Sequence, residues 1–217
     1  MLLPSTAALT ALAGLCALAY LLWFCHKPSS LLKTLVKTAS VLLLAGAAWR
    51  ADAPALLLLA LTLCAVGDFF LSREGESAFL AGVAAFAAGH IAYIALFLGV
   101  PGSDIAAIPI AAIIALLLFA AAMMILLYRH AGPLRLAVLF YVPVIVGMGL
   151  AAMAVPAAGA LWLVLPAALV FMASDTVLAS ELFLLRPDHP MRRITPFVIW
   201  TLYWLAQLGF LMGFAVL

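Results

Sequence analysis

The chain has 217 residues, of which 70% are hydrophobic and only 8% are charged. A soluble globular domain carries roughly 45–50% apolar and about 25% charged residues, so this composition excludes a soluble fold and requires lipid as the solvent for most of the surface. The net charge of +2 is uninformative, and because no nucleic-acid signature is present we expect no nucleic-acid partner. The three cysteines lie in apolar runs without metal-ligand spacing and are read as packing residues. We expect one transmembrane domain over residues 1–217.

Continuous apolar runs define the elements along the chain. An open sheet cannot sit in lipid, and these runs are too long for barrel strands, so the predicted fold is all-α. With about 20 residues per helical span, the chain holds about eight spans and short loops. In chain order they are about Ser5–Phe24, Leu31–Trp49, Pro54–Ser72, Ala78–Leu98, Ile105–Tyr128, Leu134–Ala154, Ala160–Leu185 and Ile194–Val216.

Basic residues are unevenly distributed over the predicted loops. The first, third, fifth and seventh loops carry nearly all of the loop lysines and arginines, whereas the other side has only Arg50, beside Asp52. The positive-inside rule then puts the odd-numbered loops in the cytoplasm and both termini outside. The short loops and the high Ala and Leu content favour a bacterial inner membrane.

Several polar side chains fall inside these predicted spans, where a charge costs several kcal/mol. With the orientation above, residues from five helices gather in the cytoplasmic half of the membrane or near its floor. This convergence predicts one cavity that opens toward the cytoplasmic leaflet. Its candidate residues are Lys33, Lys37, Asp68, His90, Tyr93, Asp175, Tyr203 and Gln207.

Structural interpretations of the same residues remain open. The two lysines could extend to the interface, and Asp68 could simply form a salt bridge with one of them. His90 could be a hydrogen-bonded core residue, while Tyr203 and Gln207 could join helices. Glu181 and the arginines that follow it are read as interfacial residues. Asp175 is the hardest to explain structurally because it lies deepest. His90 is the only deep histidine, so a multi-histidine metal site is not expected.

Two aspartates lie in short segments that echo each other. Val66–Ser72 and Ala173–Ala179 each contain a small residue, then Asp, then two residues, then Leu. Two carboxyl groups in a dry cavity form an acid/base pair when one holds a proton and a nearby lysine keeps the other ionised. The protonated group can act as a general acid, and the ionised group can stabilise a cation or direct a water.

The ordered set of motifs resembles the lysoplasmalogenase (YhhN-like) family of eight-helix membrane proteins. The resemblance runs from about Lys33 to Gln207. In the second and third spans, its motifs are the two lysines and Gly67-Asp68-Phe69-Phe70-Leu71. In the fourth span they are Phe79-Leu80-Ala81-Gly82 followed by Phe86, Gly89-His90 and Tyr93. In the last three spans they are Tyr141, then Ser174-Asp175-Thr176-Val177-Leu178-Ala179, then Tyr203-Trp204-Leu205-Ala206-Gln207.

The resemblance implies hydrolysis of the vinyl ether bond of lysoplasmalogens, without a metal or other cofactor. The products would be a fatty aldehyde and glycerophosphoethanolamine or glycerophosphocholine. Asp68 and Asp175 would share the acid and charge-stabilising roles, Lys33 and Lys37 would hold the lipid phosphate, and the remaining candidates, His90, Tyr93, Tyr141, Tyr203 and Gln207, would bind or orient substrate and water.

Two other functions remain compatible with the residues. One is a small proton-coupled transporter that uses the same Asp and Lys residues as a relay, although no clear inverted repeat is present. The other is a non-catalytic lipid-binding protein. Membrane lipids are partners in all three cases. The sequence does not predict an oligomeric state, although Gly209 and Gly213 form a close-packing face on the last span.

Overall fold

The structure is a computed structural model that describes residues 4–215, and within this range all regular elements are helical. Eight α-helices form the bundle. Their bounds are Pro4–Ala19 (α1), Leu31–Arg50 (α2), Ala55–Leu71 (α3), Glu76–Leu98 (α4), Ile110–His130 (α5), Arg135–Met153 (α6), Val164–Phe183 (α7) and Thr195–Ala215 (α8). A π-helical turn, η1 (Tyr20–Phe24), continues α1, and 3₁₀ turns lead into α6, α7 and α8.

The predicted all-α bundle is confirmed, and the chain is a multi-pass membrane protein. Seven helices, with their adjoining turns, are long and apolar enough to cross a membrane. The predicted third span corresponds to the shorter apolar helix α3, which has 17 residues. At 1.5 Å per residue α3 reaches about 25 Å, near the lower limit for a transmembrane helix.

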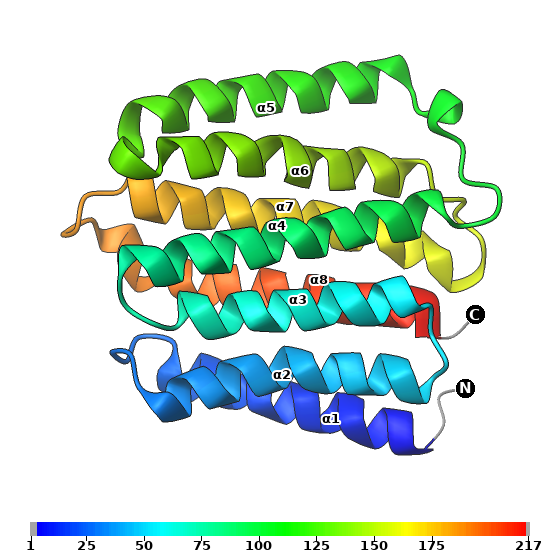
Figure 1. Cartoon of the computed structure of the whole chain (residues 1–217), viewed down its shortest axis with the longest axis horizontal. Coiled ribbons are helices and arrows are strands. Elements are labelled where there is room, and N and C mark those ends of the chain that lie inside the picture. The colour runs from blue at the N-terminus through cyan, green and yellow to red at the C-terminus, as the bar shows by residue number, and fades with distance from the viewer. Residues whose placement is uncertain (1–3, 216–217) are drawn as a thin grey trace.

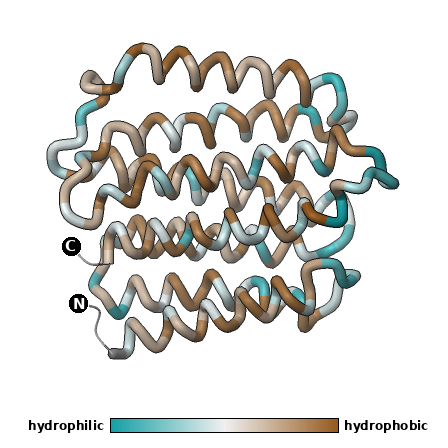
Figure 2. The backbone as a smooth tube through the Cα atoms, turned by 180° about the vertical axis from the view of Figure 1, so that it is seen from behind, coloured by the Kyte–Doolittle hydropathy of each residue, from teal (hydrophilic) through white to brown (hydrophobic). Residues whose placement is uncertain are grey.

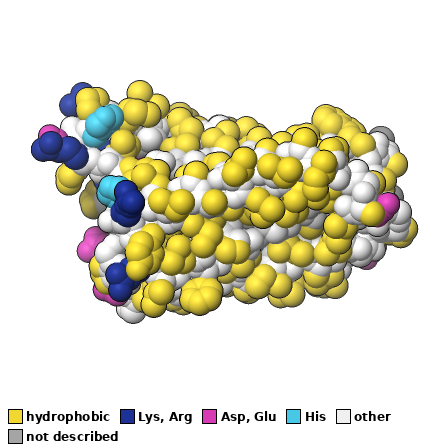
Figure 3. Space-filling view, turned by 90° about the horizontal axis from the view of Figure 1, so that it is seen from above, with side chains coloured by type: hydrophobic (Ala, Val, Ile, Leu, Met, Phe, Trp, Pro, Cys, Tyr) yellow, Lys and Arg dark blue, Asp and Glu magenta, His cyan; other side chains and the backbone are white. Residues whose placement is uncertain are grey.

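The helices run back and forth along one direction, and both ends of the described chain lie at the same end of the bundle (Figure 1). The connections α1–α2, α3–α4, α5–α6 and α7–α8 lie at the opposite end. Hydrophilic backbone positions concentrate there, while the middle of the bundle is mostly hydrophobic (Figure 2). Lysine, arginine and histidine side chains gather at this end on the face shown in Figure 3. We call it the basic end.

Glycines allow α3 and α4 to pack closely. A Cβ on Gly67 would lie 2.6 Å from the Phe86 ring, and one on Gly82 would lie 2.7 Å from Leu71. A Cβ on Gly89 would lie 2.9 Å from the Cys64 sulfur and 3.3 Å from a backbone oxygen of α3. Small residues draw membrane helices together in this way because van der Waals contact replaces the hydrophobic drive. The contact fixes α3, the helix that carries Asp68, against α4.

Close contacts also hold α8, the last helix, against its neighbours on two sides. A Cβ on Gly209 would lie 2.8 Å from that of Ala167, and one on Gly213 would lie 3.2 Å from Val164. The predicted small-residue face therefore packs α8 against α7 within the chain. On another side, the Trp200 indole N–H donates to the Ala17 carbonyl oxygen at 3.0 Å. α8 thus connects the α7 side of the bundle to the α1 side.

Candidate active site

A cavity of about 290 Å³ lies within the bundle and is lined by residues from the seven helices α2 to α8, from η1 and from Cys25. Asp68 and Asp175 both line it, together with Lys37, Tyr141 and Tyr203. The predicted convergence of polar side chains on one cavity therefore holds for four of its eight candidates, Lys37, Asp68, Asp175 and Tyr203. Tyr141, which only the family resemblance implied, lines the cavity with them. Most of the remaining lining is apolar and comes from α4, α5, α6 and α7.

Asp68 sits at the α2–α3–α8 side of the cavity and is almost fully buried, with 1% of its side chain exposed. Its Oδ1 lies 3.1 Å from the Lys37 Nζ, and its Oδ2 accepts a hydrogen bond of 2.7 Å from the Tyr203 hydroxyl. Both carboxylate oxygens are thus satisfied, which offsets the cost of burying the charge. The Lys37 ammonium also lies over the rings of Tyr20 and Trp200, at 5.9 and 5.8 Å from their centroids. This arrangement favours an ionised Asp68.

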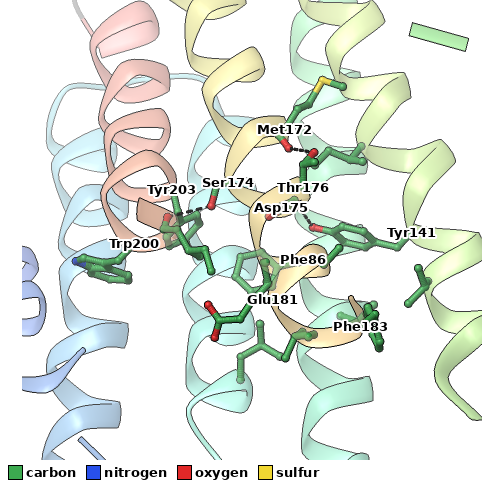
Figure 4. A pocket seen from close by; sticks show the side chains of 18 of the residues that line it. Phe86, Tyr141, Met172, Ser174, Asp175, Thr176, Glu181, Phe183, Trp200 and Tyr203 are labelled. Carbon is green, nitrogen blue, oxygen red and sulfur yellow. Dashed lines mark hydrogen bonds between the residues drawn. The ribbon is translucent and has the colours of Figure 1, made fainter. Parts of the chain in front are cut away.

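Asp175 has a different environment on the α6–α7 side. Its Oδ2 accepts a hydrogen bond of 2.5 Å from the Tyr141 hydroxyl (Figure 4). Among residues 4–215, no Lys, Arg or His nitrogen lies within 4.0 Å of this carboxyl group. The side chain is only partly buried because it faces the cavity. A carboxyl group without a cation in an apolar cavity can hold a proton and donate it.

His90, Tyr93 and Gln207 lie outside the cavity lining, although all three are buried. The Tyr93 hydroxyl donates to the Gln207 Oε1 at 2.5 Å and ties α4 to α8. The His90 Nδ1 is 2.6 Å from the Phe86 carbonyl oxygen, and its ring packs edge-on against Tyr141 at 5.5 Å between centroids. These residues therefore pack behind the residues that line the cavity. His90 packs against Tyr141, which donates a hydrogen bond to Asp175.

Lys33 is also absent from the cavity lining. Its Nζ bonds to the backbone carbonyl oxygen of Lys27 at 2.5 Å and to that of Cys25 at 3.4 Å. Both acceptors belong to the α1–α2 connection at the basic end. Lys33 and Lys37 share a helix face, as predicted, but they lie one turn apart. Lys33 is therefore at the α1–α2 connection, whereas Lys37 is in the cavity lining.

Sequence reasoning missed several polar or aromatic lining residues. Tyr20 and Trp200 form an aromatic wall, with ring centroids 4.3 Å apart. Ser174 lines the cavity and donates to the Ile199 carbonyl oxygen at 3.0 Å, beside Tyr203 (Figure 4). Glu181, read as interfacial, also lines the cavity. The sequence does not show that Tyr20 and Trp200 line a cavity, because an aromatic residue that faces lipid and one that faces a cavity both lie among apolar residues.

The arrangement suits proton transfer to an apolar substrate. Within residues 4–215, no three His, Cys, Asp or Glu side chains group closely enough to hold a metal ion. The cavity combines a carboxyl group paired with a lysine and a second carboxyl group that has no cation within 4.0 Å among the described residues. It also offers a large apolar wall for a hydrocarbon chain. Such a site can protonate a substrate and stabilise the resulting cation.

Comparison with known protein families decides the relationship. The model of the YhhN family matches residues 32–214. The chain belongs to the YhhN family. This match spans every cavity helix from α2 to α8, and the family includes lysoplasmalogenases. Comparison with curated proteins and with solved structures gave no match.

Proposed function

We propose that this YhhN-family protein is a lysoplasmalogenase, which hydrolyses the vinyl ether bond of lysoplasmenylethanolamine or lysoplasmenylcholine. The observation that carries the proposal is the pairing of Asp68 and Asp175 in one largely apolar cavity, with a cation beside only one of them. Vinyl ether hydrolysis needs a proton donor, an anion near a developing cation and a water. The cavity offers the first two groups on separate helices.

Asp175 is the proton donor in this mechanism. Its proton adds to the vinyl carbon farther from the ether oxygen, and the other vinyl carbon becomes an oxocarbenium ion. The Tyr141 hydrogen bond on Oδ2 holds the carboxyl group in place. This leaves Oδ1 to carry the proton toward the substrate. Positioned general acids of this kind typically contribute about 10²–10⁴-fold to the rate.

Asp68 is the anion that stabilises the oxocarbenium ion and directs the water. Lys37 and Tyr203 hold it ionised and fixed before substrate arrives, so no reorganisation is needed during the reaction. Water adds to the cationic carbon and its proton returns to Asp175. The resulting hemiacetal then loses its hydroxyl proton while the glycerol oxygen gains one. The carbon–oxygen bond breaks, giving a fatty aldehyde and the glycerophospho alcohol.

The apolar side chains of the cavity would bind the alkenyl chain of the substrate. Phe119 and Met123 from α5, Ile145 from α6 and Leu182 from α7 are among them. The head group would then face the basic end, where Lys33 and Lys37 supply positive charge for the phosphate. We also propose that this end faces the cytoplasm of a bacterium, since basic connections are retained on that side.

Substrate discrimination tests this proposal. Purified protein in detergent would be incubated with lysoplasmenylethanolamine, with its saturated alkyl ether analogue and with the acyl ester analogue. We expect aldehyde from the vinyl ether alone. In D₂O the aldehyde should carry one deuterium on the carbon beside the carbonyl, because that carbon receives the proton. Folded protein that releases no aldehyde, or aldehyde without this deuterium, would contradict the proposal.

A further inference from the structure

The Glu181 carboxylate is an acidic side chain in the cavity that the proposed reaction does not use. Glu181 lies in the last turn of α7, so it faces the cavity near the basic end. Its Oε2 is buried and has no hydrogen-bond partner among the described residues. No Lys, Arg or His nitrogen within residues 4–215 lies within 4.0 Å of either carboxylate oxygen. A buried carboxylate oxygen without a partner is costly, so this position calls for a ligand.

Arg192 lies at the same helix end but forms no salt bridge with the Glu181 carboxylate. An Arg192 guanidinium nitrogen donates to the backbone carbonyl oxygen of Glu181 at 2.5 Å and to that of Leu185 at 3.3 Å. Arg192 therefore caps the carboxyl end of α7, where a positive charge is favourable. The side-chain carboxylate remains available to the cavity. In Figure 4 the Glu181 side chain extends from α7 toward the side that carries Trp200.

Glu181 and Lys37 line the same cavity, and Lys33 lies one helical turn from Lys37, outside the lining. Cys25, which follows the first membrane-spanning segment and lines the cavity, reports this proximity. Its carbonyl oxygen accepts a hydrogen bond of 3.4 Å from the Lys33 Nζ, and Lys37 and Glu181 line the same cavity as Cys25. Opposite charges thus lie around one cavity mouth. A ligand that carries an anion and a cation a few bonds apart would match both.

We propose that Glu181 binds the ammonium group of a zwitterionic lysolipid head group, with the phosphate held on the Lys33–Lys37 side. Glu181 is then a specificity-determining residue for phosphoethanolamine and phosphocholine head groups over head groups without a cation. The Tyr20–Trp200 aromatic wall lines the same cavity and offers ring faces to a quaternary ammonium. The proposal rests on the proposed function for the identity of the lipid, but its test does not require turnover.

Binding of saturated alkyl ether lysolipids tests the proposal, because these lipids cannot be hydrolysed at a vinyl ether. Three lipids with one chain length and different head groups would be compared in the same detergent: phosphoethanolamine, phosphocholine and phosphate alone. Calorimetry, or the intrinsic fluorescence of the five tryptophans, would give Kd for wild type, Glu181→Gln and Asp188→Asn. Asp188 is the matched control because its carboxylate is 77% exposed and pairs with Arg186 outside the cavity.

We expect wild type and Asp188→Asn to bind the two zwitterionic lipids about tenfold more tightly than the phosphate lipid, as for one partly exposed charge-assisted contact. Glu181→Gln should lose this preference while binding the phosphate lipid at least as well as wild type does. That last result also shows that the variant is folded. Equal weakening of all three lipids, or an unchanged preference, would overturn the proposal.

The outcomes for wild type separate this proposal from the proposed function. Wild type that binds all three lipids equally overturns the role of Glu181 alone. Wild type that binds zwitterionic lipids selectively but releases no aldehyde from a vinyl ether overturns the proposed function and leaves the head-group site standing. Wild type that binds none of the lipids overturns both.

Discussion

The two aspartates of the cavity lie in segments that share one pattern, a small residue, Asp, two residues and Leu, but they have different neighbours. Asp68 is buried, lies 3.1 Å from Lys37 and accepts a hydrogen bond from Tyr203. Asp175 accepts a comparable hydrogen bond from Tyr141, but no cation among residues 4–215 lies within 4.0 Å of it. The difference teaches that the surrounding helices, not the segment itself, decide which carboxyl group is an anion and which can be an acid.

The largest expected effect on activity comes from Asp175→Asn. The amide cannot donate the proton that starts the reaction, so aldehyde release should fall about 1,000-fold, within the range for a positioned general acid. Thermal stability should change little, because an amide keeps the Tyr141 hydrogen bond and strands no charge. Steady-state kinetics and thermal unfolding in detergent measure the two effects. Asp188→Asn, on the exposed α7–α8 connection, should keep full activity.

Asp68→Asn should reduce activity by about 100-fold, the loss of one electrostatic stabiliser, and should also destabilise the fold. The substitution leaves the buried Lys37 ammonium without its partner, and breaking a buried ion pair costs about 3–5 kcal/mol. The double variant Lys37→Met/Asp68→Leu should unfold at a higher temperature than Asp68→Asn while remaining inactive. If Asp68→Asn and Asp175→Asn were equally stable, the contrast between the two sites would be wrong.

The two tyrosines offer a smaller, matched comparison. Tyr203→Phe removes a hydrogen bond to an ionised carboxylate, so we expect about a tenfold loss of kcat. Tyr141→Phe removes one that positions a protonated group, and its loss should be about threefold. Tyr128→Phe, on an exposed position of α5, serves as the control with unchanged kinetics. An order reversed between Tyr203 and Tyr141 would argue that the two aspartates have exchanged roles.

Much of the fold was predictable because lipid imposes a simple length rule on helices. The predicted Leu31–Trp49 and Ala78–Leu98 differ by at most two residues at either end from α2 and α4. The fifth span fits less well: it is predicted to begin at Ile105, but residues Ile105–Ala107 form a separate 3₁₀ turn and α5 begins only at Ile110. Hydropathy locates an apolar run, but caps and turns decide where a helix ends.

The site was only partly predictable. Depth along each span brought Asp68, Asp175, Lys37 and Tyr203 to one level, and all four line the cavity. Rotation about each helix axis could not be read, because lipid-facing and core-facing sides are both apolar. His90, Tyr93 and Gln207 consequently fall outside the lining, whereas Lys33 falls outside it because it lies one helical turn nearer the α1–α2 connection than Lys37. Glu181 was missed for the opposite reason: a charge near a helix end resembles an interfacial residue.

The protonation state of each carboxyl group tests the division of labour most directly. Infrared spectroscopy of the purified protein at neutral pH distinguishes a protonated carboxyl group from a carboxylate by its carbonyl stretch. We predict a protonated-carboxyl band that persists in Asp68→Asn and disappears in Asp175→Asn. A band that disappears in Asp68→Asn instead, or no such band in wild type, would contradict the assignment of Asp175 as the acid and Asp68 as the anion.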